Sequence, residues 1–214
     1  MFWEILELRR IEVLKKITNN MPEMGMENSY LAGGTALALQ LGHRKSYDFD
    51  WFIPEEFNPE ELKQSLEKIG RVRDVKLSKA TLHLNFEAVR VTWLYYPNPV
   101  LKPLLQIKEP VELKIASIED IALMKLVAIS SRGAKRDFVD LYYICKEGFS
   151  INNLIAEIPS KYPTSDLNKY HIVKSLSYFE DADKEVLDPL SIPWEEIKRY
   201  FSKQAKSILE DFRT

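Results

Sequence analysis

The chain has 214 residues, of which 45% are hydrophobic and 29% are charged, with a formal net charge of −2 at pH 7. These values are typical of a soluble globular chain that forms one domain, or one domain with a helical extension. The charge argues against a generally basic nucleic-acid binder, although it leaves room for a local basic patch. No apolar run approaches the roughly 20 residues needed to cross a bilayer, so we expect no membrane partner.

Cysteine and histidine are scarce in this chain. The single cysteine, Cys145, excludes an internal disulfide and fits a reducing cytoplasm, which is where we expect the protein. One cysteine and three scattered histidines also argue against a zinc site.

In chain order, apolar residues at helical spacing predict an amphipathic helix over 3–20. Residues 29–32 predict a short strand that ends at Gly33-Gly34, and Thr35 is placed to cap a helix over 36–41. The next strand is expected over 47–53.

The rest of the chain divides into a β-rich part and a helical part. The spacing predicts a helix over 59–69 and then strands over 72–77, 81–86 and 89–96, the last two joined by a tight turn at residues 87–88. Helices follow over 121–131 and 137–147, with three or four more from 151 to 214. We therefore expect an α+β fold, with a core over 1–116 and a helical region over 117–214, of which 117–148 completes the active site.

The most informative stretch runs from residue 31 to 52. Asp48 and Asp50 are two apart in a predicted strand, so they project to the same side. A pair of carboxylates suits Mg²⁺ or Mn²⁺. The Gly33-Gly34 turn ahead of a helix can present backbone N–H groups to a phosphate. Together these features indicate nucleotide chemistry.

The chain resembles the AbiEii/AbiGii-type toxins of the nucleotidyltransferase superfamily. The resemblance rests on four elements in order, which are Gly33-Gly34-Thr35, the segment 44–50 (Arg-Lys-Ser-Tyr-Asp-Phe-Asp), Lys125 within a helix, and the segment 135–140 (Lys-Arg-Asp-Phe-Val-Asp). It implies a mixed sheet flanked by helices, with a C-terminal helical extension. It also implies an enzyme that moves a nucleoside monophosphate from a nucleoside triphosphate to an acceptor hydroxyl, with tRNA as one acceptor and a cognate antitoxin as partner.

The resemblance also assigns roles to residues. Asp48 and Asp50 would hold the metal, and Lys125 would meet the phosphates. Asp137 would act as the general base, and Asp140 would hold Lys125 or an arginine in place. Six further residues would contact the substrate, and they come from the glycine turn, the segment 44–50 and the segment 135–140. They are Gly33, Gly34, Thr35, Arg44, Ser46 and Arg136.

One position departs from the superfamily pattern and leaves alternatives open. Many nucleotidyltransferases carry a third acid on a later strand, and the matching position here is Thr92, which cannot act as a base at neutral pH. This departure favours either one metal with Asp137 as the base or a catalytically silent nucleotide-binding module. A separate alternative is an enzyme with a small-molecule or protein acceptor, and the acidic charge fits a small acceptor slightly better than RNA.

Overall fold

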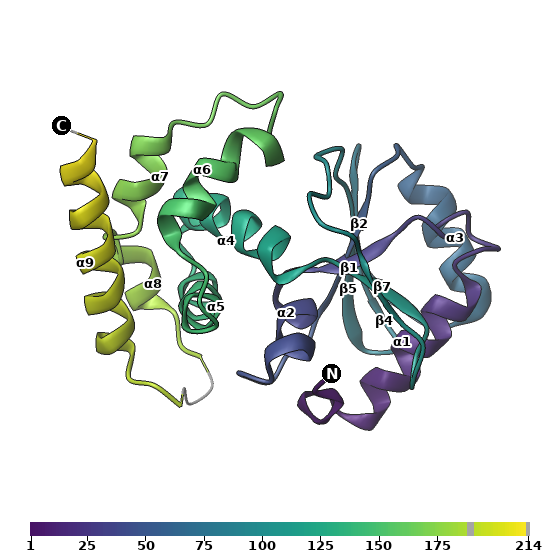
Figure 1. The fold of residues 1–214 in the computed structure, drawn as a ribbon. Coiled ribbons are helices and arrows are strands. Elements are labelled where there is room, and N and C mark those ends of the chain that lie inside the picture. Colours follow the sequence, from purple (N-terminus) through teal and green to yellow (C-terminus); the bar gives the residue numbers. More distant parts are fainter. Residues whose placement is uncertain (188–190, 213–214) are drawn as a thin grey trace. The chain divides into compact units, whose positions relative to one another are not determined.

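The computed structural model describes residues 1–187 and 191–212. The chain divides into two compact units, Met1–Ser117 and Ile118–Thr214 (Figure 1). The first unit holds the sheet and the second is helical, and each is described below by itself.

The first unit is an α+β unit. Its helical elements are η1 (Trp3–Ile5), α1 (Leu8–Asn20), α2 (Gly33–Leu41) and α3 (Pro59–Ile69), and its strands are β1 (Tyr30–Ala32), β2 (Phe49–Ile53), β3 (Val72–Ser78), β4 (Thr81–Phe86), β5 (Val89–Tyr95), β6 (Leu105–Ile107) and β7 (Leu113–Ile115). Within residues 1–117, α1 and α3 lie together on one side of the sheet (Figure 1).

The strands form one mixed sheet. Over the described residues its seven strands have the order β3-β4-β5-β2-β1-β7-β6. β2 lies at the centre, antiparallel to β1 and parallel to β5. The mixed sheet and flanking helices confirm the expected fold class. The strands β6 and β7 were not predicted.

The expected single helix over 3–20 is wrong, because the chain is extended between η1 and α1 at Leu6 and Glu7. The physical reason is a tertiary contact. The backbone N–H of Phe2 donates to the carbonyl of Leu39 at 2.8 Å, which ties the N-terminal segment to α2. Leu6 is thereby buried, whereas Leu8 stays exposed.

Two local signals predicted their elements correctly. The side chain of Asn58 accepts hydrogen bonds from the backbone N–H groups of Glu60 and Glu61, and Pro59 occupies the first turn, so α3 spans the predicted 59–69. Glu87 and Ala88 have φ values of 50° and 62°, which is the left-handed conformation that a two-residue hairpin turn requires. The turn between β4 and β5 is therefore confirmed.

The two faces of the central strands differ in character. One face is apolar, and its fully buried residues include Phe49, Trp51, Val91, Trp93 and Leu82. The other face carries the polar residues of the same strands in register, and it is the face that bears the predicted site.

The second unit is helical. It contains α4 (Ile118–Arg132), α5 (Lys135–Lys146), α6 (Ile151–Lys161), α7 (Lys169–Ser175), α8 (Glu180–Lys184) and α9 (Trp194–Asp211). Phe138 of α5 is fully buried, and its ring contacts those of Phe179, Trp194 and Phe201 at centroid distances of 5.2 to 5.9 Å. These aromatic contacts hold Phe179, Trp194 and Phe201 against α5. No helix in the described parts of the chain is both long enough and apolar enough to span a membrane.

Candidate active site

The turn at Gly33 lies directly against the second predicted metal ligand. Gly33 has φ +71°, and a Cβ built at this position would lie 3.1 Å from Asp50 Oδ2. Register explains the closeness, because Ala32, the last residue of β1, is paired with Asp50 of β2. Glycine therefore both adopts the left-handed conformation and leaves space beside the carboxylate.

The helix α2 begins at Gly33, with Ala32 as its N-cap. Ala32 has no side-chain oxygen to satisfy the first N–H groups of the helix, and this is the kind of helix end that binds anions. The prediction that Thr35 caps the helix is wrong. Thr35 lies inside the first turn and is buried.

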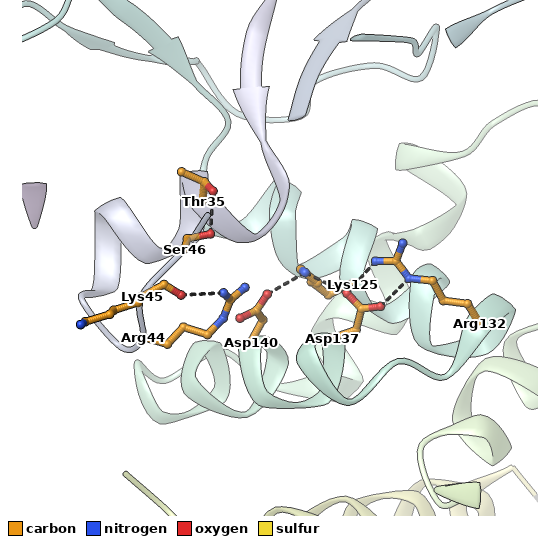
Figure 2. Close-up of polar contacts among 8 residues, drawn as sticks. All are labelled: Thr35, Arg44, Lys45, Ser46, Lys125, Arg132, Asp137 and Asp140. Carbon is orange, nitrogen blue, oxygen red and sulfur yellow. Dashed lines mark hydrogen bonds and ion pairs between the residues drawn. The ribbon is translucent and has the colours of Figure 1, made fainter. Parts of the chain in front are cut away.

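The Thr35 hydroxyl instead holds the segment that leads to Asp48. Its Oγ1 lies 2.6 Å from the Ser46 Oγ (Figure 2) and also donates to the backbone carbonyl of Asp48. Because this carbonyl is bonded to Thr35, β2 starts at Phe49 and not at residue 47 as predicted. Thr35 and Ser46 are both buried, so this geometry gives them a positioning role. Their contact with phosphate stays a prediction.

Asp48 and Asp50 lie on the same face, as predicted. Asp50 pairs with Thr92, Arg90 lies two residues from Thr92 on that face, and Arg90 Nη1 is 3.6 Å from Asp48 Oδ2. Phe49, between the two aspartates, is fully buried on the other face. Each aspartate is half-buried, so the carboxylates are accessible at the surface of the sheet.

This donor set fits a hard divalent cation. Both side chains offer oxygen, and the space that a Cβ at Gly33 would fill lies next to Asp50 Oδ2. Among the described residues, no group of three or more His, Cys, Asp or Glu side chains gathers as a metal cage. Such a pair suits Mg²⁺, which commonly takes one or two carboxylates and completes its shell with water and substrate phosphates.

Arg44 and Arg136 are the two predicted arginine contacts. Arg44 lies in the loop between α2 and β2 and donates from Nη1 to the carbonyl of Lys45 at 3.0 Å (Figure 2). Arg136 is exposed on α5. Their roles in substrate binding stay predictions.

In the second unit, Lys125 lies between two carboxylates. Its Nζ is 2.8 Å from Asp137 Oδ1 and 2.6 Å from Asp140 Oδ2 (Figure 2). The lysine side chain is 8% exposed and both aspartates are 0% exposed. The ion pairs link α4 to α5, and Asp140 holds Lys125 as expected.

A residue that the sequence interpretation missed completes this group. Arg132, the last residue of α4, donates from Nε to Asp137 Oδ2 at 2.8 Å and from Nη2 to Oδ1 at 3.0 Å. The spacing in the sequence could have indicated Arg132, because this residue follows Lys125 by two helical turns and so lies on the same face of α4. Asp137 is therefore bonded to two cations.

The electrostatics do not favour Asp137 as a general base. Burial alone would raise the pKa of Asp137, but Lys125 and Arg132 outweigh it and hold the pKa below its ordinary value. Burial would likewise lower the pKa of Lys125, but Asp140 and Asp137 raise it. A buried carboxylate that already neutralises two cations is a weak proton acceptor. This geometry gives Asp137 a positioning role.

Lys161 forms a second buried ion pair in this unit. Its side chain is 1% exposed, and its Nζ lies 2.7 Å from Asp120 Oδ1. This buried ion pair joins the end of α6 to the first turn of α4. Lys161 therefore cannot meet a large acceptor at the surface.

Two comparisons with known proteins match most of the chain. The model of a family described as the nucleotidyl transferase AbiEii toxin of type IV toxin–antitoxin systems matches residues 25–213. An uncharacterised protein of Aquifex aeolicus (strain VF5) is 37% identical over 210 residues, which cover 96% of this chain and 98% of that protein.

Solved structures share the fold. The nucleotidyltransferase toxin MenT4 of Mycobacterium tuberculosis H37Rv has a TM-score of 0.60 at 16% identity, covering 91% of this chain and 82% of that one. The antibiotic-resistance factor ANT(2'')-Ia has a TM-score of 0.55 at 16% identity, covering 74% of this chain and 95% of that one.

Proposed function

This chain belongs to the AbiEii family of nucleotidyl transferase toxins, and from that premise we propose that it is a metal-dependent enzyme that transfers a nucleoside monophosphate from a nucleoside triphosphate to a hydroxyl of tRNA. The observation that carries the proposal is the closeness of Gly33 to Asp50, whose Oδ2 would lie 3.1 Å from a Cβ at Gly33. It joins a helix N-terminus suited to phosphate to a carboxylate suited to a metal.

In this proposal Asp48 and Asp50 hold Mg²⁺ or Mn²⁺, and the bound ion supplies positive charge to the reacting phosphate. The N–H groups at the start of α2 bind the triphosphate. Thr35 holds the backbone carbonyl of Asp48, and Ser46 bonds the Thr35 hydroxyl, which together orient the segment that carries the Asp48 carboxylate. Lys125 contributes phosphate affinity, and Asp137 and Asp140 fix its ammonium group.

We favour tRNA over other acceptors because of the toxin family. The chain's net charge of −2 instead favours a small acceptor, and the antibiotic-resistance factor of similar fold gives this second candidate a structural precedent. We further propose a cognate antitoxin as partner and a cytoplasmic location, to which the single cysteine is suited.

The test is incubation of the protein with each α-labelled nucleoside triphosphate, Mg²⁺ or Mn²⁺, and total bacterial tRNA. A parallel series replaces tRNA with small hydroxyl compounds. We expect label on tRNA, lost with EDTA and in Asp48→Asn. If only the small compounds carry label, the acceptor is a small molecule and not tRNA. If the protein binds triphosphate but transfers to no acceptor, a silent nucleotide-binding module is favoured.

A further inference from the structure

The second unit contains a pocket where α7 packs against the end of α4 (Figure 1). Its volume is about 310 Å³. Sites for small ligands measure roughly 300–1,000 Å³, so this pocket suits one group of about the size of a nucleotide. The lining includes Arg132, His171, Lys174, Ser175, Tyr178 and Asp181.

A hydrogen bond holds one face of α7 towards the pocket. His171, Lys174 and Ser175 are three and four residues apart, so they share a face of the helix. The Nε2 of His171 lies 3.2 Å from the backbone carbonyl of Ser130. A carbonyl only accepts hydrogen bonds, so this nitrogen donates and ties α7 to the last turn of α4.

The charges of the pocket favour an anion. Arg132 donates from Nε and Nη2 to Asp137, which fixes its guanidinium, yet its side chain is still 64% exposed. At the C-terminus of α4 it also offsets the partial negative charge of that helix end. The one acid in the lining, Asp181, is paired with Lys184 at 3.3 Å.

Lys174 supplies the uncompensated charge. It is exposed, and within residues 1–187 and 191–212 no carboxylate pairs with its ammonium. A lysine ammonium is a point charge with three N–H donors, and phosphate is a common partner of such a group.

An aromatic ring borders the same pocket. Tyr178 is 53% exposed, and its hydroxyl donates to Glu180 Oε2 at 2.6 Å, which restrains the ring. Exposed tyrosine rings are stacking surfaces for unpaired bases. A cation and a stacking ring side by side match a phosphate and the base next to it.

Both an RNA strand and a free nucleotide have this chemistry, and the position of the pocket favours the strand. Arg132 and Lys125 both pair with Asp137, and they are two turns apart on α4, about 10 Å along the helix axis. In the proposed function Lys125 already binds the triphosphate. A polymeric acceptor needs a separate site of this kind near its reacting end.

We propose that this pocket binds the RNA acceptor, with Lys174 on a backbone phosphate and Tyr178 stacked on a neighbouring base. The inference rests on the proposed function and names the residues that recognise its acceptor. Neither residue takes part in the chemical step. Their loss therefore weakens acceptor binding and leaves the rate of transfer at saturating acceptor unchanged.

The experiment measures the affinity of the intact protein for end-labelled total bacterial tRNA by filter binding, without triphosphate, at several salt concentrations. The variants are Lys174→Gln, which removes the charge, Tyr178→Leu, which removes the ring, and Tyr178→Phe, which keeps it. The matched control is Lys203→Gln, an exposed lysine of α9 outside the pocket lining. Triphosphate affinity is measured by equilibrium dialysis, and KM for tRNA and kcat by labelled transfer.

We expect Lys174→Gln to weaken tRNA binding about fivefold and to reduce the slope of log affinity against log salt by about 0.7, the value for one phosphate contact on a single strand. Tyr178→Leu should weaken binding about fivefold or more, while Tyr178→Phe and Lys203→Gln should resemble the wild type. Both losses should raise KM for tRNA, with kcat and triphosphate affinity unchanged.

Wild-type tRNA affinity and salt slope in Lys174→Gln and Tyr178→Leu would overturn the role of the pocket and leave the proposed function intact. If these variants lose affinity for triphosphate and not for tRNA, the pocket binds the nucleotide and its assignment to the acceptor is wrong. A wild type that transfers to small compounds but binds no tRNA would overturn both this inference and tRNA as the acceptor.

Discussion

At the scale of single residues, the site depends on a glycine that does two tasks. The left-handed φ of Gly33 ends β1 and starts α2, and its missing side chain leaves space for the Asp50 carboxylate. The chain offers a control for the first task. Gly25 has φ +67°, but nothing lies within 4 Å of a Cβ built there.

We predict that Gly33→Ala and Gly25→Ala destabilise the protein by a similar amount, about 1 kcal/mol, because each places a Cβ in the left-handed region. Only Gly33→Ala should also lower transfer activity, since its methyl group displaces Asp50 Oδ2. Thermal unfolding and the labelled-transfer assay check the pair. Equal activity in the two variants would contradict the role of Gly33 beside the carboxylate.

Asp48 tests the metal assignment more directly. We expect Asp48→Asn to lower transfer by at least about 100-fold, because the loss of one carboxylate weakens a cation site that has two. The fold should remain intact, since Asp48 is half-buried and its backbone carbonyl still bonds Thr35. The matched control is Asp166→Asn, an exposed residue of the second unit. Unchanged turnover in folded Asp48→Asn would refute the metal site.

At the scale of elements, α4 and α5 are held together by buried charge. The ammonium of Lys125 lies between Asp137 and Asp140, and Arg132, at the end of α4, also pairs with Asp137. The two buried ion pairs of Lys125, supported by the exposed Arg132, specify which face of α4 meets α5, because the buried charges are costly without their partners.

We predict that Lys125→Met costs about 3–5 kcal/mol of stability, because it removes a buried cation that lies between two fully buried carboxylates, while Arg132 still pairs with Asp137. Lys203→Met, at an exposed position of α9, should change stability little. Chemical denaturation measures both variants. The affinity of folded Lys125→Met for triphosphate then distinguishes a phosphate-binding role of Lys125 from a structural one. Wild-type affinity would make Lys125 structural only.

At the scale of the whole molecule, the same charges set how stability depends on pH. The pKa of Asp137 is lowered in the folded state, so its contribution is present above the unfolded value of about 3.9 and is lost as the pH falls through the folded pKa. The pKa of Lys125 is raised, so its contribution is present below about 10.4 and is lost as the pH rises through the folded pKa.

We therefore expect the unfolding temperature to be highest between about pH 4 and pH 10 and to fall outside that window. In Asp137→Asn the unfolding temperature should fall less on the acid side, because the carboxylate whose protonation lowers stability there is absent. Scanning calorimetry from pH 2 to 11 compares the two proteins. Identical acid limbs would show that Asp137 does not contribute to acid unfolding.

Local chemistry made part of the fold predictable. The Asn58 cap with Pro59 set α3, and the two-residue turn at Glu87 and Ala88 set the hairpin of β4 and β5, because caps and tight turns depend on residues only a few positions apart. The strands β6 and β7 escaped prediction. Each has three residues, too few for alternation to be visible, and each forms only through pairing with a distant strand or its neighbour.

The candidate site was likewise predictable only in part. The sequence by itself determined that Asp48 and Asp50 share a face and that a glycine turn precedes them, since strand alternation is a property of the local backbone. Only the tertiary structure decided that Gly33 lies against Asp50, that Lys161 is buried on Asp120, and that His171 bonds the carbonyl of Ser130. Those contacts join residues up to 41 positions apart, and spacing along the chain carries no record of which distant partner a strand or helix will meet.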